Sequence, residues 1–422
     1  MPNFPYYMLC IWTFIHIGRP QDILSFLVPL HIGDITAALT IFSYYVTAQN
    51  RPRIRSYPEV RLFLLFVGLA ALSAPFGYYP RKSLEFLFEF AVKLGIYLWL
   101  IGKLITTEER VQGILKTLMY CGFAMAASAI LRAGTEARVG GGGAYDPNDL
   151  GLVLVTTLPI AVIQGLTIPS VRWKIVCFGG AAFNLIGIIA TQSRGAFLAL
   201  LGLGAFLLIV KLPGISKKKL VLISVALALL FGTYIGVAYK ERIRTIFDES
   251  YSDVRAGSGR IGLWRQCLHV ARDHPVLGVG PDAFSTAFGH YLENDKFPEE
   301  LSRDQLGGKW QTAHNSFLLV LVEMGLPGLL VFLGINIRSF RNFQRVKSTS
   351  ANHGRASILS IQATTLQLAL SGFLTCAFFL SQSYNTVIYL FLLLSGALRR
   401  SADEASYNPD QPDGPGAQSS SS

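Results

Sequence analysis

Runs of mostly apolar residues recur along the whole of this chain, separated by short connections that hold Pro, Gly and charged residues. Most runs are about 17–25 residues long, the length that a helix needs to cross a hydrocarbon core of roughly 30 Å. Hydrophobic residues make up 51% of the 422 residues and charged residues only 15%, which is more apolar surface than soluble domains bury in their cores. The sequence therefore predicts an all-α polytopic membrane protein.

We expect about twelve transmembrane helices, one for each apolar run. The expected spans are residues 3–17, 23–48, 60–76, 84–104, 111–131, 150–168, 174–190, 195–211, 219–239, 315–337, 357–379 and 383–398. The first span is short and contains Pro5, so a re-entrant hairpin over residues 3–34 is the alternative there.

The net charge of +11 is concentrated in the connections that follow alternate spans. These basic residues are Arg51, Arg53, Arg55, Arg172, Lys174, Lys217, Lys218, Lys219, Arg338, Arg341, Arg345, Lys347, Arg355, Arg399 and Arg400. The positive-inside rule places these connections and both termini in the cytoplasm. The excess positive charge then faces the inner leaflet, and no nucleic-acid partner is needed to explain it.

Four parts follow from this topology. Residues 1–239 would hold transmembrane helices 1–9, residues 240–313 a periplasmic loop domain with short helices, and residues 314–398 helices 10–12. Residues 399–422 have the composition of a disordered cytoplasmic tail. No metal-ligand spacing occurs among the cysteines or in the outer loops, so we expect neither a metal nor a cofactor.

Arg194 lies at the outer end of the seventh span, in the segment TQSRGAF. An ionised guanidinium near membrane depth is tolerated where it faces water, an anion or the protein interior. The small residues Ser193, Gly195 and Ala196 would let another group approach the arginine closely. This pattern favours a bound phosphate over the alternative, an arginine that snorkels to the interface as an anchor.

Arg260 precedes a predicted amphipathic helix in the long loop. Ile261, Trp264 and Leu268 recur there at spacings of three and four residues, which is typical of the apolar face of a helix. That helix would lie on the bilayer surface or pack under the loop. Arg260 would then be held over the membrane face, and an ion pair with a nearby loop aspartate is the alternative role.

Polar residues open two of the expected spans. His314 lies at the mouth of the tenth span. Its imidazole could accept the proton of a sugar hydroxyl there, because an imidazole titrates near neutrality. An ordinary interfacial residue is the alternative, and Asn315 could bind sugar or orient the ring. Asn148, in GGGGAYDPNDLG, could cap the sixth span. That glycine run follows no strand, which excludes a nucleotide-binding fingerprint.

Five segments in combination resemble the O-antigen ligase family. They are DPNDLG (146–151), TQSRGAFLAL (191–200), GRIGLW (259–264), HPVLGVGPDAF (274–284) and HNSFLLVLVEMGLPGLL (314–330). The resemblance rests on the order of these segments, on their spacing and on their common side of the membrane. The expected number of helices also agrees with the family, so the resemblance covers nearly the whole chain. The family also includes relatives that act as glycan polymerases and protein O-oligosaccharyltransferases.

The resemblance implies an inverting, metal-independent glycosyltransferase of the GT-C-like type. It would move a glycan from undecaprenyl diphosphate to the lipid A-core oligosaccharide, on the periplasmic face of the bacterial inner membrane, in lipopolysaccharide biosynthesis. The catalytic arginines of the family fall on Arg194 and Arg260, and its histidine falls on His314. Four further residues are candidates for substrate binding: Asn148, Trp264, Arg265 and Asn315.

Three other functions stay open on the sequence alone. Two are a polymerase that joins lipid-linked glycans and a protein O-oligosaccharyltransferase that acts on Ser or Thr. The third is a transporter of lipid-linked glycans. Transporters usually hold polar sites near the bilayer midplane, within repeats, whereas the polar residues singled out above gather at one face. The apolar run of residues 84–104 would offer surface to the polyprenyl chain and to membrane lipids.

Overall fold

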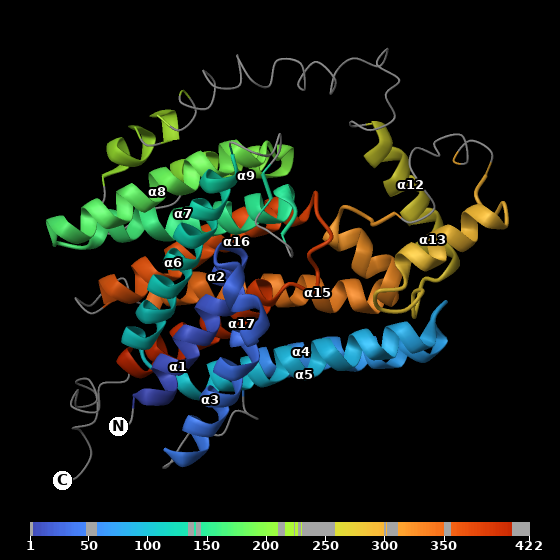
Figure 1. Ribbon diagram of the computed structural model, residues 1–422, viewed down its shortest axis with the longest axis horizontal. Coiled ribbons are helices and arrows are strands. Elements are labelled where there is room, and N and C mark those ends of the chain that lie inside the picture. The colour runs from blue at the N-terminus through green and yellow to red at the C-terminus, as the bar shows by residue number, and fades with distance from the viewer. Residues whose placement is uncertain are drawn as a thin grey trace, which may run out of the picture.

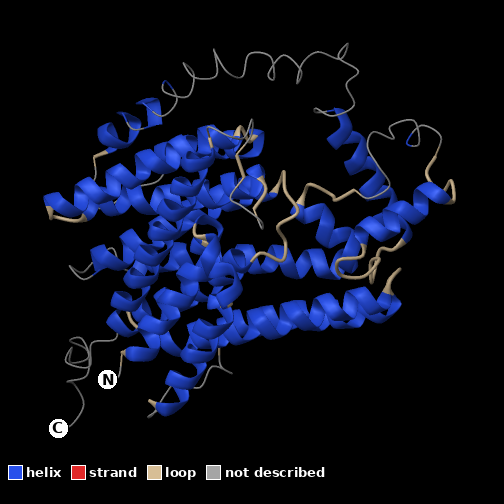
Figure 2. Ribbon diagram, in the orientation of Figure 1, coloured by secondary structure: helices blue, strands red, loops and turns tan. Residues whose placement is uncertain are grey.

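The described part of the protein is built from helices (Figure 2). The computed structural model describes residues 3–47, 57–133, 139–140, 145–209, 216–222, 224–226, 229, 258–298, 301, 311–349 and 356–406, and none of these lies in a β-strand. The all-α prediction is confirmed for these residues. Most of the expected ninth span, the loop residues 240–257, the Gly141–Gly143 run and the tail from residue 407 lie outside them.

Helices occupy the other ranges in which we expected spans, and two further helices lie in the described part of the long loop. Their bounds are α1 (Phe4–Thr13), η1 (Phe14–Gly18), α2 (Pro20–Ile23), η2 (Ser25–Leu30), α3 (Ile32–Val46), α4 (Pro58–Ser73), η4 (Ala74–Phe76), α5 (Pro80–Leu104), α6 (Glu108–Arg132), α7 (Pro147–Thr167), α8 (Val171–Thr191), α9 (Arg194–Ile209), α12 (Ser258–Asp273), α13 (Phe284–Glu293), α15 (Ser316–Thr349), α16 (Ala356–Ala377) and α17 (Thr386–Ser406).

Among the described residues, six helices are long and apolar enough to cross a membrane: α4 together with η4, α6, α7, α8, α15 and α16. The helices α3 and α9 are apolar but shorter. The chain is therefore a multi-pass membrane protein. The full count of about twelve spans stays a prediction.

The second expected span differs from the sequence-based boundary. Residues 23–48 do not form one helix, because α3 begins only at Ile32 and the residues before it form the 3-10 helix η2. Pro29 lies inside η2, and a proline lacks the N–H that a continuing α-helix would need. His31, with a φ of 46°, then turns the chain into α3.

Two groups of helices pack side by side, as Figure 1 shows. The helix α7 contacts α6, α8, α9 and α16, and α15 contacts α4, α16 and α17. The short helices α12 and α13 lie together at the right of Figure 1 and pack against α15. The start of α15 and the residues Phe378 and Phe379 therefore come close to α12.

The helix α15 is interrupted near its start. Gly325 has a φ of 67°, which no α-helix contains, and the interruption frees backbone carbonyl groups that water cannot reach inside a membrane. The segment 275–280 bonds to them: Val279 and Gly280 donate N–H groups to the carbonyl oxygens of Val322 and Glu323, at 2.8 and 3.0 Å. Leu326 in turn donates to Pro275, at 2.8 Å. The loop is thus bonded directly to the kink.

The opposite ends of the same helices carry a second polar cluster. Glu59, at the start of α4, accepts hydrogen bonds from Arg338 Nε and Asn342 Nδ2 of α15, at 3.0 and 2.8 Å. Arg400 of α17 lies 4.0 Å from the same carboxyl group. Arg338 and Arg400 on one side and the kink with its loop on the other therefore lie at opposite ends of α4, α15 and α17, and which of these ends faces the cytoplasm stays a prediction.

A glycine-to-alanine pair tests the bonded kink. Gly278 has a φ of 70°, and a Cβ there would collide with the Glu323 backbone. Alanine in this left-handed region costs about 1–2 kcal/mol before the collision is counted, so we expect Gly278→Ala to lower the thermal unfolding midpoint of the purified protein. Gly95→Ala is the control, since a Cβ at Gly95 meets nothing within 4 Å. Equal midpoints for the two variants would contradict the role given to this contact.

Candidate functional site

The turn between α8 and α9 places Arg194. Gln192 adopts a φ of 50° and ends α8, and Ser193 Oγ accepts the N–H of Ala196 at 3.3 Å, which caps α9. Arg194 is the first residue of α9 and is half-buried. A Cβ at Gly151 of α7 would lie 2.8 Å from Ala196, so the small residues noted in the sequence let α7 and α9 pack closely here.

Trp264 ties α12 to the start of α15. Its indole Nε1 donates to the carbonyl oxygen of Ala313, the residue before His314, at 3.1 Å. Its ring meets Phe378 edge-on at 5.4 Å. Arg260 lies four residues earlier and therefore on the same face of α12. The neighbouring Arg265 is exposed. The structure thus gives Trp264 a positioning role, and a contact of Arg265 with substrate stays a prediction.

The helix α12 is amphipathic, and a second apolar stripe lies beside the predicted one. Ile261 and Leu268 of the predicted stripe are about half exposed, at 55% and 51%. Leu263, Cys267 and Val270 are buried, in a cluster with residues of α13 and α15. This buried stripe was not predicted, and contact of the Ile261 stripe with the bilayer surface stays a prediction.

His314 is held in a conformation that histidine rarely adopts. Its φ is 44°, and its backbone N–H donates to Ser381 Oγ at 3.0 Å. Its Nε2 lies 3.4 Å from Thr312 Oγ1. Non-glycine residues in this region are uncommon and concentrate at functional sites. The ring is therefore fixed at the mouth of α15 by the neighbouring chain.

Burial lowers the pKa of the His314 imidazole, and the positive charge of Arg260 lowers this pKa further. Asp146 opposes both effects and raises the pKa, but the net shift is downward. His314 is therefore mostly neutral near pH 7, the form that can accept a proton. The same interactions place Arg260 and Asp146 near the ring, so two of the three predicted catalytic residues come together. Arg194 lies at the same end of the bundle.

One expectation for the two asparagines of the predicted site was wrong, the cap at Asn148, whereas substrate binding by Asn148 and Asn315 stays a prediction. Asp146, not Asn148, caps α7: its Oδ1 accepts the backbone N–H groups of Asn148 and Asp149, at 2.7 and 2.8 Å. Pro147 takes the first helical position, which shifts the cap one residue before it. Asn315 is buried, and its Oδ1 accepts the N–H groups of Phe317 and Leu318. Asn315 therefore caps the N-terminus of α15. His314 directly precedes this cap.

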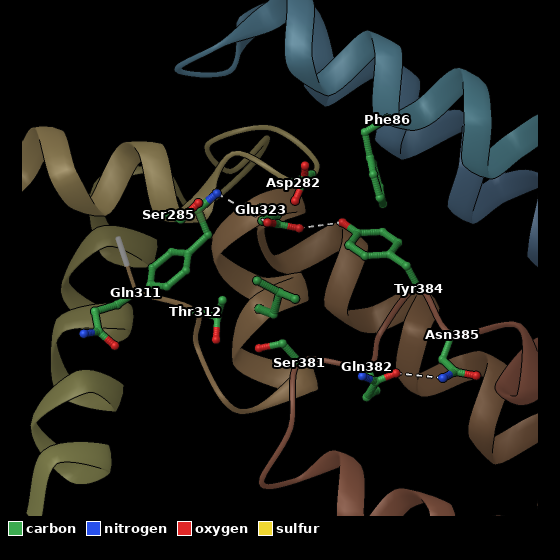
Figure 3. Close-up of a pocket in the computed structure, with 12 residues that line it drawn as sticks. Phe86, Asp282, Ser285, Gln311, Thr312, Glu323, Ser381, Gln382, Tyr384 and Asn385 are labelled. Carbon is green, nitrogen blue, oxygen red and sulfur yellow. Dashed lines mark hydrogen bonds between the residues drawn. The ribbon is translucent and has the colours of Figure 1, made fainter. Parts of the chain in front are cut away.

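A cavity of about 330 Å³ lies beside His314 (Figure 3). It is formed by α5, α13, the first turns of α15, the residues before α15 and the turn between α16 and α17. Its lining residues are Phe86, Asp282, Phe284, Ser285, Gln311, Thr312, Leu319, Glu323, Ser381, Gln382, Tyr384 and Asn385. Thr312 and Ser381 both line the cavity and contact His314, so the cavity and the histidine are direct neighbours.

Glu323 is a buried carboxyl group in the cavity wall. Its Oε2 accepts the hydroxyl of Tyr384 at 2.7 Å, and its Oε1 accepts the N–H of Phe284 at 3.3 Å. Figure 3 shows Glu323 and Tyr384 pointing toward one another in the cavity wall. Sequence reasoning missed Glu323, although it is the sole acidic residue in the apolar run 315–337. A lone charge within a membrane span is itself a signal of function.

A second polar group joins the start of α7 to the turn after α16. Gln382 Nε2 donates to Asp149 Oδ1 at 2.6 Å, and Gln382 Oε1 accepts from Asn385 Nδ2 at 2.7 Å. The backbone of Gln382 is bonded to Ser316 of α15, at 2.8 Å. These contacts join α7, α15 and α17 at one point. Nothing in the sequence around residues 381–385 indicated a part in the site.

Comparison with known families gives two matches. Residues 179–333 match the family described as O-antigen ligase, and we call this stretch the O-antigen ligase domain. Residues 3–173 match a family of unknown function, DUF5935, and no curated protein matches the chain significantly.

Arg194, Arg260, His314 and Glu323 all lie in the O-antigen ligase domain. Asp146 and Asp149 come from the preceding matched region, and residues 381–385 follow the domain. The site is therefore assembled from three stretches of the chain. In the part that the structure describes, no three His, Cys, Asp or Glu side chains gather as a metal site would. Metal-independence itself stays a prediction.

The charges around His314 make a prediction about pH. If neutral His314 is required, activity falls on the acidic side as the ring takes up a proton. Because Asp146 raises the His314 pKa, Asp146→Asn should lower that pKa and move the acidic limb of kcat/KM to lower pH. Asparagine also caps helices well, so the fold should be kept.

Arg260 has the opposite effect, since its charge lowers the same pKa. Arg260→Gln should therefore move the acidic limb to higher pH, whatever its effect on the rate. The measurement is the pH profile of glycan transfer by the two variants and the parent protein. If the acidic limbs of the pH profiles coincide in the parent protein and both variants, His314 is not the group whose protonation lowers the activity.

Proposed function

We propose that the protein is an O-antigen ligase, an inverting glycosyltransferase that needs no metal. It transfers a glycan from undecaprenyl diphosphate to the lipid A-core oligosaccharide at the periplasmic face of the bacterial inner membrane. One observation carries the proposal: within the O-antigen ligase domain, Trp264 of α12 donates a hydrogen bond to the carbonyl oxygen of Ala313, the residue before His314, at 3.1 Å, and Arg260 lies one turn earlier on the same face of α12. A proton acceptor and a cation for the leaving group are then adjacent.

The chemistry needs both groups at once. The acceptor hydroxyl attacks the anomeric carbon from the face opposite the diphosphate, and the new C–O bond forms as the old one breaks. His314 takes the hydroxyl proton, and the diphosphate leaves with the bonding electron pair. Arg194 and Arg260 bind the negative charge that grows on it, since fixed guanidinium groups stabilise such charge without reorganisation. Attack from the opposite face inverts the anomeric configuration.

The polyprenyl chain of the donor would lie along α5. Leu84, Phe88 and Val92 follow one another at four-residue spacing on this helix, so they share one face. All three are exposed, Phe88 by 70%. An apolar face that no other part of the described structure covers is suited to lipid. The same helix contributes Phe86 to the cavity, so it reaches both the lipid surface and the site.

Two substitutions separate chemistry from donor binding. His314→Ala should reduce transfer by about 10²–10⁴-fold, the usual cost of losing one acid–base group, while donor binding stays nearly normal. Arg260→Lys keeps the positive charge but loses the planar set of hydrogen-bond donors that can bind two phosphate groups at once. This variant should therefore keep little of the parent activity. Donor affinity and transfer rate are measured for each variant in reconstituted membranes.

Matched controls are available on the same chain. Arg272→Lys changes an exposed arginine of α12, and His31→Ala removes a histidine whose side chain is 76% exposed. Both should transfer at the parent rate. Full activity of Arg260→Lys, or normal transfer by His314→Ala, would refute the proposed roles.

A further inference from the structure

The cavity beside His314 offers a diphosphate no cation among its described lining residues. Two of these residues, Asp282 and Glu323, carry carboxyl groups, and none of the residues that the structure describes there is a lysine or an arginine. Lys82 of α5 pairs with Asp282 at 3.1 Å, which offsets the charge of that carboxylate, and Glu323 is buried and hydrogen-bonded to Tyr384 and Phe284. A phosphate in this cavity would bury its charge without a partner among the described residues, so the cavity disfavours phosphate groups.

Its other lining groups suit a sugar ring. Phe86, Phe284 and Tyr384 supply aromatic surface, against which the C–H face of a sugar can pack. Amide and hydroxyl groups that can each donate and accept hydrogen bonds face the same space: Ser285, Gln311, Thr312, Ser381, Gln382 and Asn385. The volume of about 330 Å³ lies at the lower end of the range for ligand pockets, about 300–1,000 Å³.

The aromatic part of the wall is fixed before any ligand binds. The Tyr384 ring meets Phe86 edge-on, with centroids 4.9 Å apart, and Phe90 at 5.3 Å. Its hydroxyl is held by Glu323. Figure 3 shows Phe86 and Tyr384 on one side of the cavity and Gln311 and Ser285 on the other. A preorganised wall of this kind costs little ordering entropy when a ligand binds.

The position of the cavity relates it to the reaction. Thr312 lies in the wall and its hydroxyl is 3.4 Å from His314 Nε2. A sugar hydroxyl bound beside Thr312 would therefore be a neighbour of the atom that is to take its proton. Neither Arg194 nor Arg260 is among the residues that line the cavity, so the groups proposed to bind the diphosphate lie outside it.

We propose that this cavity is the acceptor subsite and that it binds the terminal sugar of the acceptor as an uncharged, unphosphorylated ring. The proposal rests on the proposed function and adds the chemical class of the acceptor end. Glu323 and Tyr384 form the wall that orients the ring. Thr312 and Ser381 connect the ring to His314.

A binding experiment without the donor tests the subsite. The probes are the methyl glycosides of glucose, galactose and N-acetylglucosamine and their 6-phosphates, added to the intact protein in lipid nanodiscs. Saturation-transfer NMR reports contact of each sugar with the protein. We expect signals from at least one uncharged glycoside, and markedly weaker signals from its 6-phosphate.

A cavity-filling variant locates the signal. Ser285→Trp puts an indole into the cavity from the first turn of α13 and should abolish the signal. Ser348→Trp makes the same change on an exposed part of α15, near the opposite end of the bundle, and should leave the signal unchanged. Absence of binding in the parent protein, equal binding of the 6-phosphates, or a signal that survives Ser285→Trp would overturn the proposal.

Donor binding is measured in parallel with an undecaprenyl diphosphate-linked glycan. Ser285→Trp should bind this donor as the parent protein does but fail to transfer it. A parent protein that binds the glycosides and not the donor would refute the proposed function and keep the sugar site. A parent protein that binds and transfers the donor but shows no glycoside signal would refute the subsite alone.

Discussion

The interruption of α15 at Gly325 is the constraint on which the site depends. A break in a membrane helix frees backbone groups that must find partners within the protein, because lipid offers none. Here the partners are supplied by residues 275–280, and Ser73 at the end of α4 adds a hydrogen bond to the Glu323 carbonyl at 2.9 Å. The loop that follows α12 is therefore fixed to the bundle at the level of Glu323.

This attachment sets the distribution of charge around His314. Because the loop is bonded to the kink, α12 lies beside the start of α15 and brings Arg260 to the histidine. The kink also places Glu323 in the wall of the cavity. In the proposed account, the start of α15 lies between Arg260, which would bind the diphosphate, and an aromatic and polar cavity, which would bind a sugar.

Much of this arrangement could be predicted from the sequence, and the limits have physical causes. Hydropathy located the helices because membrane spans must be apolar along their whole length, and the five short motifs indicated Arg194, Arg260 and His314. The stripe of α12 that packs inside the protein was missed because only its contacts with α13 and α15 distinguish it from the stripe through Ile261. Gln382 and Tyr384 were missed because their function comes from contacts with Asp149 and Glu323, which only the folded chain brings together.

The most direct test is a cryo-electron microscopy structure of the protein with an undecaprenyl diphosphate-linked glycan bound. The account predicts the diphosphate in contact with Arg194 and Arg260, and the anomeric carbon of the first sugar facing His314. It also predicts that the cavity at Glu323 stays free of phosphate. A diphosphate bound inside that cavity, or at the opposite end of the bundle beside Arg338 and Arg400, would contradict it.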